Sequence, residues 1–404
     1  MTSGQRITKI DGKWHVPDQP IVCFIQGDGI GPEVWGATRK TVDRAVEKTY
    51  GGKRKICWEE LQAGQKALNE IGELLPQATK DKIVQNRVCI KGPLMTPIGG
   101  GHRSLNVTMR QEFKLFSCIR PVRYYPGVAS PMKAPENVDM VVFRENIEDI
   151  YVGIEWPSGS DKVKKVIDFL NQEMGTRIPA QAGVGIKYMT REGTHRIMRV
   201  AMQYAVDNNK QVVTITHKGN IMKYTEGSFK EWAYELAQAE FGDRIILEKD
   251  LPADRKVPAG KILVNDRIAD NMFQQLLINP EHYQVICAPN LNGDYLSDAL
   301  AAEVGGLGMS PGANIGDDIA IFEATHGTAP DVAGMNVANP SSLILSAVMM
   351  LNFMGWKEAA KLLEDSLAQV LLSKTVTVDL AKNIPDAKKV GTSEFADRIL
   401  DQMK

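Results

Sequence analysis

The stretch that decides the fold is IVCFIQGDGIGPEVWGATRKTVDRAVEKT, residues 21–49. Its first six residues are mostly apolar, with several β-branched or aromatic side chains, and predict a buried strand over 21–26. The glycines of GDGIGPE predict a tight turn, and Pro32 with the amphipathic residues after it predicts a helix over 33–49. The spacing is G-x-G-x-G rather than G-x-G-x-x-G, so this turn alone is weak evidence for a dinucleotide site.

The same alternation of strand and helix continues along the chain. Further strands are expected at residues 87–90, 140–144, 212–216, 244–248 and 285–288, and further helices at 194–207, 225–241, 268–278 and 341–354. Alternating elements of this kind predict an α/β fold with a largely parallel sheet. A length of 404 residues favours two domains rather than one core.

The composition excludes several classes of function. The chain has 48 basic and 49 acidic residues, whereas nucleic-acid and membrane-surface proteins usually carry a broad basic face. No apolar run reaches the about 18 residues of a membrane span, and the first residues lack the apolar core of a signal peptide. The five cysteines are widely spaced and odd in number, which predicts reduced core residues and a cytoplasmic protein.

A second stretch, GGGHRSLNVTMRQEFKLFSCIRPVR at residues 99–123, concentrates positive charge. It holds four arginines and a lysine against one acid, although the whole chain is nearly neutral. A guanidinium group presents a fork of donors that matches a carboxylate or phosphate. The stretch therefore predicts a pocket for a small molecule with several acidic groups.

A third motif, NLNGDYLSDAL, places Asp294 and Asp298 four residues apart. On a helix both carboxylates would lie on one face. With Asp270, which lies in another helix-like segment, they form an oxygen-only set suited to Mg²⁺ or Mn²⁺. The alternative is that they are solvated surface aspartates.

Three further segments carry candidate chemistry. Tyr151 follows Arg144 at a strand end and would serve as a general acid if cations lowered its pKa. Lys218 follows another strand and would serve as a base near a metal ion. His326, Gly327 and Thr328 form a turn suited to a phosphate or an adenine edge. A packed tyrosine, a surface lysine and a plain loop are the alternatives, but the whole set favours metal-assisted oxidation and decarboxylation of a hydroxy acid.

These motifs together resemble the metal-dependent β-decarboxylating dehydrogenases, especially the bacterial-type isocitrate dehydrogenase branch. The likeness runs from GDGIGPE through NLNGDYLSDALA to the C-terminal helices. It implies the two-domain α/β fold of that family, with a mixed, largely parallel sheet that is not a Rossmann fold. The implied division is a large domain (1–115 and 305–404), a small domain (116–148 and 191–304) and a clasp-like dimerisation segment (149–190). It also implies a homodimer with shared active sites.

The resemblance assigns roles to matching positions. Tyr151 would protonate the enol, and the partner subunit would donate Lys218 for proton transfer. Isocitrate would be bound by Ser104, Asn106, Arg110, Arg120 and Arg144. The Mg²⁺ or Mn²⁺ ligands would be Asp294, Asp298 and Asp270 of the partner subunit. The cofactor would contact Thr96, His326, Gly327, Thr328, Ala329, Asp331, Val332 and Asn339.

One departure from the family pattern concerns the cofactor. NADP-dependent bacterial relatives carry Lys-Tyr after the HGTAP turn and a later Tyr and Arg, whereas this chain has Asp331-Val332, Val378 and Lys382. Two like charges at about 4 Å repel by roughly 1 to 4 kcal/mol, so Asp331 predicts a preference for NAD over NADP. The expected activity is NAD-dependent oxidative decarboxylation of isocitrate to 2-oxoglutarate and CO₂.

Alternative functions remain open at this point. They are an NADP-dependent isocitrate dehydrogenase, a dehydrogenase for homoisocitrate, isopropylmalate or tartrate, and a non-catalytic regulator that binds a tricarboxylate.

Overall fold

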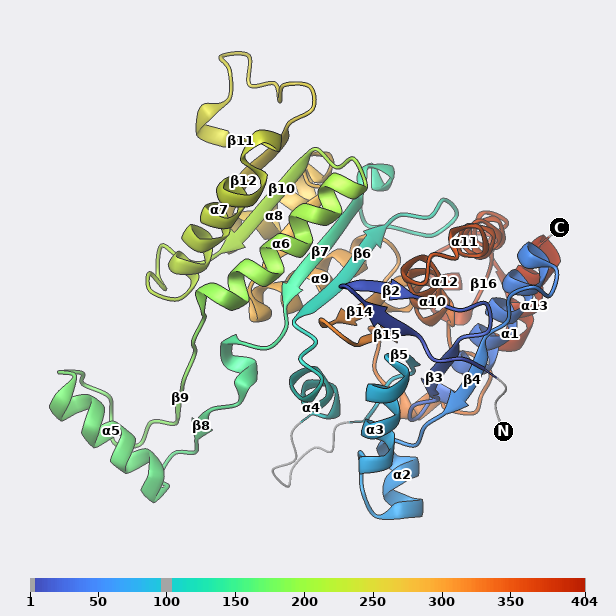
Figure 1. Ribbon diagram of the computed structural model, residues 1–404, viewed down its shortest axis with the longest axis horizontal. Helices are drawn as coiled ribbons and strands as arrows, with labels where there is room; N and C mark the ends of the chain where they lie inside the picture. Colours follow the sequence, from blue (N-terminus) through green and yellow to red (C-terminus); the bar gives the residue numbers. More distant parts are fainter. Residues whose placement is uncertain (1–3, 96–103, 404) are drawn as a thin grey trace.

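A computed structural model describes residues 4–95 and 104–403. In these ranges one sheet of eleven strands runs through both lobes of the molecule, in the order β11-β12-β10-β13-β7-β6-β14-β15-β5-β3-β4 (Figure 1). Its strands are β3 (Ile21–Ile25), β4 (Cys57–Glu60), β5 (Val88–Lys91), β6 (Ser117–Arg123), β7 (Asp139–Glu145), β10 (Val212–His217), β11 (Ile245–Leu247), β12 (Ile262–Ile268), β13 (Val285–Ala288), β14 (Pro311–Ile315) and β15 (Ala320–Ala324).

The sheet consists of two parallel blocks joined by antiparallel pairs. β6 pairs antiparallel with β7 and β14, and β14 pairs antiparallel with β15, while the other pairs are parallel. The expected α/β fold with a mixed, largely parallel sheet is confirmed. The antiparallel joint lies at β6, the strand that ends the arginine-rich stretch, and this places residues 117–123 of that stretch between the two lobes.

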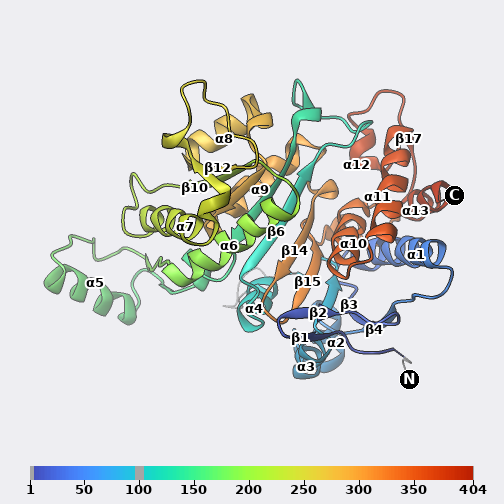
Figure 2. The same cartoon turned by 45° about the horizontal axis from the view of Figure 1, so that its top comes forward.

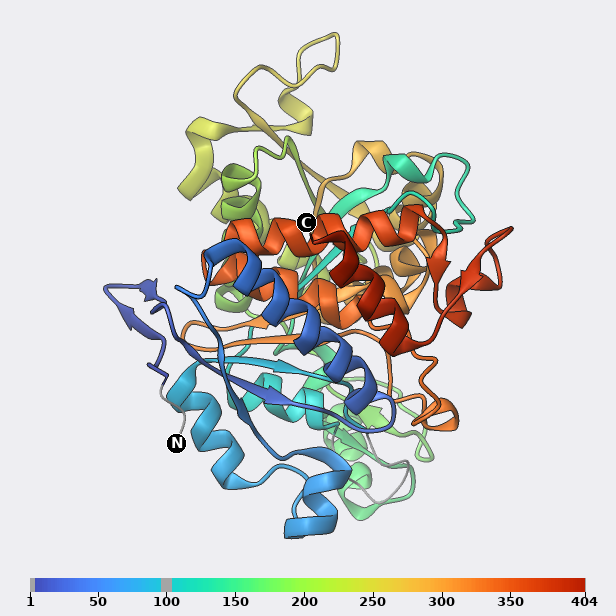
Figure 3. The ribbon, with the colours of Figure 1, turned by 90° about the vertical axis from the view of Figure 1, so that its right-hand side faces the viewer.

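The lobe at the β4 end is covered on both faces. The opening stretch forms β3 and α1 (Gly31–Tyr50), and α1 packs with α10 (Ser341–Phe353), α11 (Lys357–Leu372) and α13 (Thr392–Gln402) in one core. Figure 3 shows α1 in blue beside these red C-terminal helices. A second core packs beneath α3 (Gln77–Asn86) and α4 (Leu105–Glu112), and it includes Ala63, the residue before α2 (Gly64–Ile71).

The other lobe has the same layered arrangement, which Figure 2 shows from a tilted direction. Helices α6 (Arg191–Asp207) and α7 (Glu226–Phe241) enclose one core against β7, β10, β12 and β13. Helices α8 (Ala269–Ile278) and α9 (Asn290–Glu303) enclose another on the opposite face. The carboxyl ends of β7, β10, β12 and β13 therefore lie at one edge, where ligand sites of α/β proteins usually form.

Shorter elements complete the described chain. Helix α5 (Asp161–Glu173), flanked by β8 (Glu155–Trp156) and β9 (Val184–Gly185), stands away from the body in Figure 1. It lies within the segment 149–190 and begins with a Ser160 cap. The remaining elements are β1 (Thr8–Ile10), β2 (Lys13–His15), β16 (Thr375–Val376), α12 (Val378–Ala381) and β17 (Lys388–Lys389).

Two expectations from composition can be compared with the structure. All five cysteines are free thiols, and four of them are buried. None of the described helices combines the length and apolar character that crossing a bilayer requires.

Candidate active site

Three buried arginines converge where the two lobes meet. Arg110 lies in the last turn of α4, Arg120 on β6 and Arg144 near the end of β7, and their exposed fractions are 8%, 7% and 0%. In the β6–β7 register Cys118 pairs with Arg144, two residues before Arg120, so Arg120 and Arg144 project from the same face of the sheet. The antiparallel joint thus brings together arginines that are distant in sequence.

Helix α9 supplies the acids that face these arginines. The Asp294 carboxylate contacts the Arg144 guanidinium, and its Oδ1 lies 3.7 Å from Nη1 of Arg120. The same Nη1 lies 3.1 Å from Oδ1 of Asp298. A Cβ on Gly293 would lie 2.7 Å from the Arg144 side chain, so the glycine of NLNG permits the helix to approach the arginine. Asp294 and Asp298 do lie one turn apart on a single face.

A further pair of charges supports Arg110. Glu323 on β15 accepts from Nη2 of Arg110 at 3.1 Å, and its other oxygen lies 2.7 Å from Nζ of Lys91. The two cations hold the pKa of this buried carboxyl well below its usual range, although burial opposes them. Sequence reasoning missed both Lys91 and Glu323. The available signal was a lysine that ends the apolar run VCIK, residues 88–91.

Lys91, Arg110, Arg120 and Glu323 line a small cavity of about 140 Å³. Asn106, Arg110 and Arg120 line it on one side, and His326 and Gly327 line it on another. Several buried polar atoms have no hydrogen-bond partner within the described chain, namely Asn106 Oδ1, Arg110 Nε, Arg120 Nε, Arg144 Nη2 and His326 Nε2. Because buried polar groups are normally paired, the three arginine nitrogens fit an acidic ligand. Asn106 Oδ1 and His326 Nε2, whose ring donates from Nδ1 to the Gly327 carbonyl, would instead need a donor such as a hydroxyl.

Tyr151 lies beside Asp294, and the pKa of its hydroxyl is raised rather than lowered. Its hydroxyl donates to Oδ2 of Asp294 at 2.5 Å, and the Arg144 guanidinium lies 4.8 Å from the ring centre. Burial, followed by this hydrogen bond to a carboxylate, raises the pKa of Tyr151 to about 12. Arg144 and Arg110 do lower the pKa of Tyr151, as expected of nearby cations, but burial and Asp294 outweigh them.

Lys218 and Asp270 lie at the same sheet edge but form a separate pair. Lys218 follows β10 and Asp270 opens α8 after β12, and the Lys218 Nζ lies 2.5 Å from Oδ1 of Asp270. Their side chains are 30% and 69% exposed. Among the described residues, no group of three potential metal ligands lies close enough to hold an ion. One chain thus does not assemble Asp270 with Asp294 and Asp298.

The expected cofactor loop follows β15 and contacts the opening glycine turn. The Thr328 carbonyl accepts from the Ile30 amide at 2.9 Å, and a Cβ on Gly29 would lie 2.0 Å from that oxygen. Burial lowers the pKa of His326. The glycines of GDGIGPE therefore allow close packing against this loop, which the sequence spacing alone did not reveal.

The remaining predicted residues are placed around this loop and α4. Asn339 is buried, caps the backbone of Ser341 and donates to Asp379 at 3.0 Å. Ala329 precedes a short turn of helix, η7 (Pro330–Val332), which contains the exposed Asp331. Ser104 occupies the N-cap position of α4 and is half-buried, whereas Thr96 lies outside the described residues.

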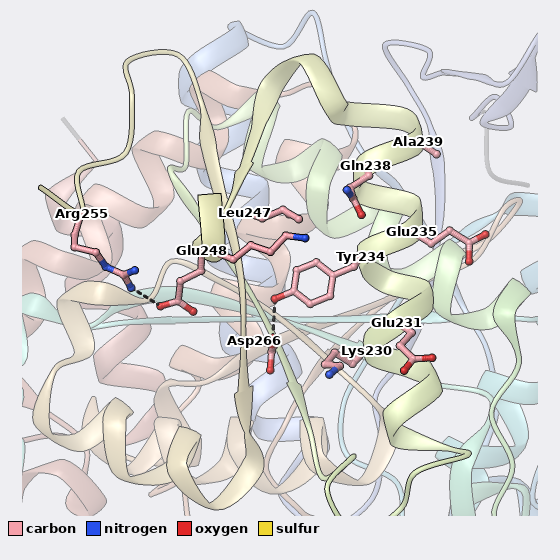
Figure 4. A pocket seen from close by; sticks show the side chains of 11 residues that line it. Lys230, Glu231, Tyr234, Glu235, Gln238, Ala239, Leu247, Glu248, Arg255 and Asp266 are labelled. Carbon is pink, nitrogen blue, oxygen red and sulfur yellow. Dashed lines mark hydrogen bonds and ion pairs between the residues drawn. The ribbon is translucent and has the colours of Figure 1, made fainter. Parts of the chain in front are cut away.

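A cavity of about 1000 Å³ lies elsewhere, between α7 and the segment after β11 (Figure 4). It contains none of the predicted site residues. Figure 4 shows the Tyr234 hydroxyl directed at Asp266, to which it donates at 2.7 Å. Asp266 in turn lies 2.9 Å from Nε2 of His217, the residue before Lys218. Tyr234, Asp266 and His217 therefore connect the wall of this cavity to the residue that precedes Lys218.

Comparison with known proteins identifies relatives over the whole chain. The model of the isocitrate/isopropylmalate dehydrogenase family matches residues 21–399. A curated relative from Staphylococcus epidermidis, named isocitrate dehydrogenase (NADP), is 53% identical over 421 residues, and the match covers 100% of this chain and 100% of the relative. One from Colwellia maris, named isocitrate dehydrogenase (NADP) 1, is 53% identical over 100% of this chain and 98% of its own.

A solved structure extends the likeness to the fold. The crystal structure of isocitrate dehydrogenase from Methylococcus capsulatus is 36% identical, with a TM-score of 0.79. The match covers 95% of this chain and 99% of that one.

The expectation of NAD as the cofactor is contradicted by these relatives, whose names specify NADP. The inference from Asp331 assumed a carboxylate fixed near the 2′-phosphate. The structure shows an exposed side chain in a short turn, with no ion-pair or hydrogen-bond partner among the described residues. An exposed carboxylate is screened by water and can rotate away, so its repulsion falls to the lower end of roughly 1 to 4 kcal/mol.

Proposed function

We propose, since this chain belongs to the isocitrate/isopropylmalate dehydrogenase family, that it catalyses the NADP-dependent oxidative decarboxylation of isocitrate to 2-oxoglutarate and CO₂, with Mg²⁺ or Mn²⁺. Hydride would pass from C2 of isocitrate to the nicotinamide, and the β-carboxylate would leave as CO₂. The observation that carries this proposal is the buried cluster of Arg110, Arg120 and Arg144, each with an unpartnered nitrogen, of which Arg110 and Arg120 line a cavity of small-molecule size.

The charge of the cluster supports a tricarboxylate. The three arginines and Lys91 face the carboxylates of Glu323, Asp294 and Asp298, which leaves one formal positive charge. A divalent ion raises this to three, the charge that balances isocitrate at neutral pH. Buried charges require such compensation, because unpaired charges are costly to desolvate.

The carboxylates of Asp294 and Asp298 have the hard oxygen donors that Mg²⁺ and Mn²⁺ prefer. They would hold the ion together with Asp270 of the partner subunit. When bound, the ion polarises the substrate hydroxyl and the adjacent carboxylate and stabilises negative charge on the enolate.

Proton transfers fall to two side chains of this protein. Lys218 would accept the proton of the substrate hydroxyl, and Tyr151 would return a proton to C3. The hydrogen bond from the Tyr151 hydroxyl to Asp294 supports this role, because it keeps the phenol protonated and close to the acids that would hold the metal. Asn106 and Ser104, at the start of α4, would contact the substrate between the arginines.

A homodimer is proposed because half of the site is exposed. The segments that carry Lys218 and Asp270 also carry apolar side chains that one chain leaves exposed: Ile221, Tyr224, Leu277 and Ile278 are between 56% and 92% exposed. A second copy that covers this surface would bury apolar area and bring its lysine and aspartate to the arginine cluster. The segment 149–190, with exposed Phe169, would act as a clasp between subunits.

The adenosine end of the cofactor would lie along His326–Ala329 and Asn339, with Asp331 and Val332 at its edge. We further propose the two-domain division, with residues 1–115 and 305–404 in one domain and 116–148 and 191–304 in the other. Closure between them would then bring the nicotinamide to the arginine cluster.

The proposal is tested by incubating the purified protein with isocitrate and Mn²⁺, with NADP and NAD in parallel, with and without a chelator. Reduction of NADP that the chelator abolishes is the expected result. Homoisocitrate, isopropylmalate and tartrate form the comparison panel. A higher kcat/KM for one of these, or no turnover of isocitrate with either cofactor, contradicts the proposal.

A further inference from the structure

Glu226, the first residue of α7, is fully buried although it carries a charge. One carboxylate oxygen lies 2.5 Å from Nζ of Lys187. The other accepts from the backbone N–H of Lys218 and from Nδ2 of Asn292, the latter at 2.8 Å. A buried carboxylate with only one ionic partner is costly, so its position calls for an explanation beyond packing.

The ion network continues from Lys187 to a second buried acid. Lys187 Nζ lies 3.0 Å from Oδ1 of Asp149, which is 1% exposed. The other oxygen of Asp149 accepts from the amide of Leu291 at 3.0 Å. Asp149 has a φ of 70°, a left-handed conformation that is unfavourable for a residue other than glycine. The contacts with Lys187 and Leu291 stabilise this conformation.

This network joins the three segments that carry the proposed chemistry. Asp149 opens the short helix η2 (Asp149–Val152), which contains Tyr151. Leu291 and Asn292 belong to the first turn of α9, the helix of Asp294 and Asp298. Glu226 connects both segments to the backbone of Lys218.

The loop after β10 is also held from its other side. The ring of His217 accepts from the Gly219 amide at Nδ1, 3.0 Å away, so its Nε2 donates to Asp266, the residue that Tyr234 contacts in Figure 4. A Cβ on Gly219 would lie 2.7 Å from Cα of Gly227, so the loop packs tightly against the start of α7. The residues on both sides of Lys218 are therefore held in place. The hydrogen bond from the Lys218 amide to Glu226 then fixes the backbone from which the Lys218 side chain projects.

We propose that Glu226 is a positioning residue. It fixes the position of Lys218 relative to α9 of the same subunit. In the proposed dimer, Lys218 acts in the partner's active site, whereas α9 belongs to the active site of its own subunit. The inference rests on the proposed function, because it takes Lys218 as the proton-transfer residue. It implies that the two active sites of a dimer are built on one continuous buried network in each subunit.

The test is a double-mutant cycle in the full-length protein with isocitrate, NADP and Mn²⁺. The variants are Glu226→Gln, Lys218→Met and the combination, with Glu235→Gln as the control because Glu235 is an exposed acid of the same helix. Glu226→Gln is expected to lower kcat by about 30-fold while KM for isocitrate changes by less than about 3-fold. In the Lys218→Met background the same change should cost less than about 3-fold, because residues that act through one group are not additive. Full additivity would overturn the proposal.

A second variant separates position from charge and protects the test against misfolding. Glu226→Asp keeps the negative charge but withdraws the carboxylate by one methylene from both the Lys218 amide and Lys187. A loss of kcat similar to that of Glu226→Gln is expected, with an unchanged melting temperature. Wild-type kcat in both variants contradicts a positioning role.

Chemical labelling distinguishes this inference from the proposed function. Acetic anhydride acetylates exposed lysines, and mass spectrometry gives the rate at each site. Glu226→Gln should change the rate at Lys218 by at least about 3-fold and leave that at Lys223 unaltered, since Lys218 would leave its contact with Asp270. If wild type does not turn over isocitrate but this labelling change occurs, the proposed function fails and the positioning by Glu226 stands. Unchanged labelling at Lys218 overturns the positioning, whatever the activity.

Discussion

The arginine cluster on α4, β6 and β7, with its acids on α9, differs in burial from the pair formed by Lys218, just after β10, and Asp270 on α8. Arg144 is fully buried and paired with Asp294, whereas Asp270 is 69% exposed and paired only with Lys218 among the described residues. Charges can be buried where one chain supplies both signs. Lys218 and Asp270 are residue types that an active site needs, but one chain does not bury them. We therefore propose that a second subunit covers this pair.

The largest expected effect comes from the buried region. Arg144→Lys keeps the charge but loses the planar fork that reaches Asn290 and Asp294. We expect kcat/KM for isocitrate to fall by about 10³-fold, which corresponds to about 4 kcal/mol. Arg123→Lys, at the exposed end of the neighbouring strand, is the control and should stay near wild type. A loss under about 10-fold for Arg144→Lys, in protein that melts normally, would remove this arginine from the substrate site.

Mixing subunits of two variants tests whether the arginine cluster and the lysine–aspartate pair of one active site come from different subunits. Lys218→Met and Tyr151→Phe should each lower kcat by about 10²-fold, because each removes one proton-transfer group. If the two regions come from different subunits, a mixed dimer of these variants contains one site with neither change. Refolding the variants together should then restore about a quarter of wild-type activity, since half of the dimers are mixed and each has one intact site. Activity no higher than that of the separate variants would place Lys218 and Tyr151 in one subunit's site.

The sequence predicted the local features of both regions and missed the features that depend on distant contacts. The strand–turn–helix of residues 21–49 and the spacing of Asp294 and Asp298 follow from backbone periodicity, which is local. Glu323 and Glu226 have no distinguishing neighbours in sequence, and their importance arises from Arg110 and Lys187, which other elements bring to them. The wrong cofactor expectation has the same origin, because the identity of Asp331 was visible in sequence but its exposure was not.

The pH dependence of stability distinguishes two acids of α9, Asp294, which is paired with arginines, and Glu303, which has no ionic partner among the described residues. Arginines lower the pKa of Asp294 against the effect of burial, whereas burial alone raises the pKa of Glu303, at the other end of the helix, to about 7. An acid whose pKa is higher in the folded state destabilises the fold when ionised. Stability should therefore fall as pH rises from the unfolded pKa of about 4.3 toward 7.

Glu303→Gln should remove this fall and raise the free energy of unfolding by about 2 kcal/mol at pH 8, with little effect at pH 4. Melting curves from pH 4 to 8 provide the measurement, with the exposed Glu192→Gln as the control. Equal pH dependence in wild type and Glu303→Gln would show that Glu303 ionises freely in the folded protein.

The smallest expected effect concerns Asp331, which like Asp270 is exposed and so contributes weakly on its own. Near the 2′-phosphate of NADP, one screened like charge costs about 1 kcal/mol. Asp331→Asn should therefore raise kcat/KM for NADP by about 5-fold and leave that for NAD nearly unchanged. Because screening by salt weakens exposed charges, the gain should shrink as ionic strength rises, and Asp243→Asn in the other lobe should show none. A gain that persists at high salt would mean that Asp331 is held against the cofactor, and the loop would then belong with the buried arginine cluster rather than with the exposed pair.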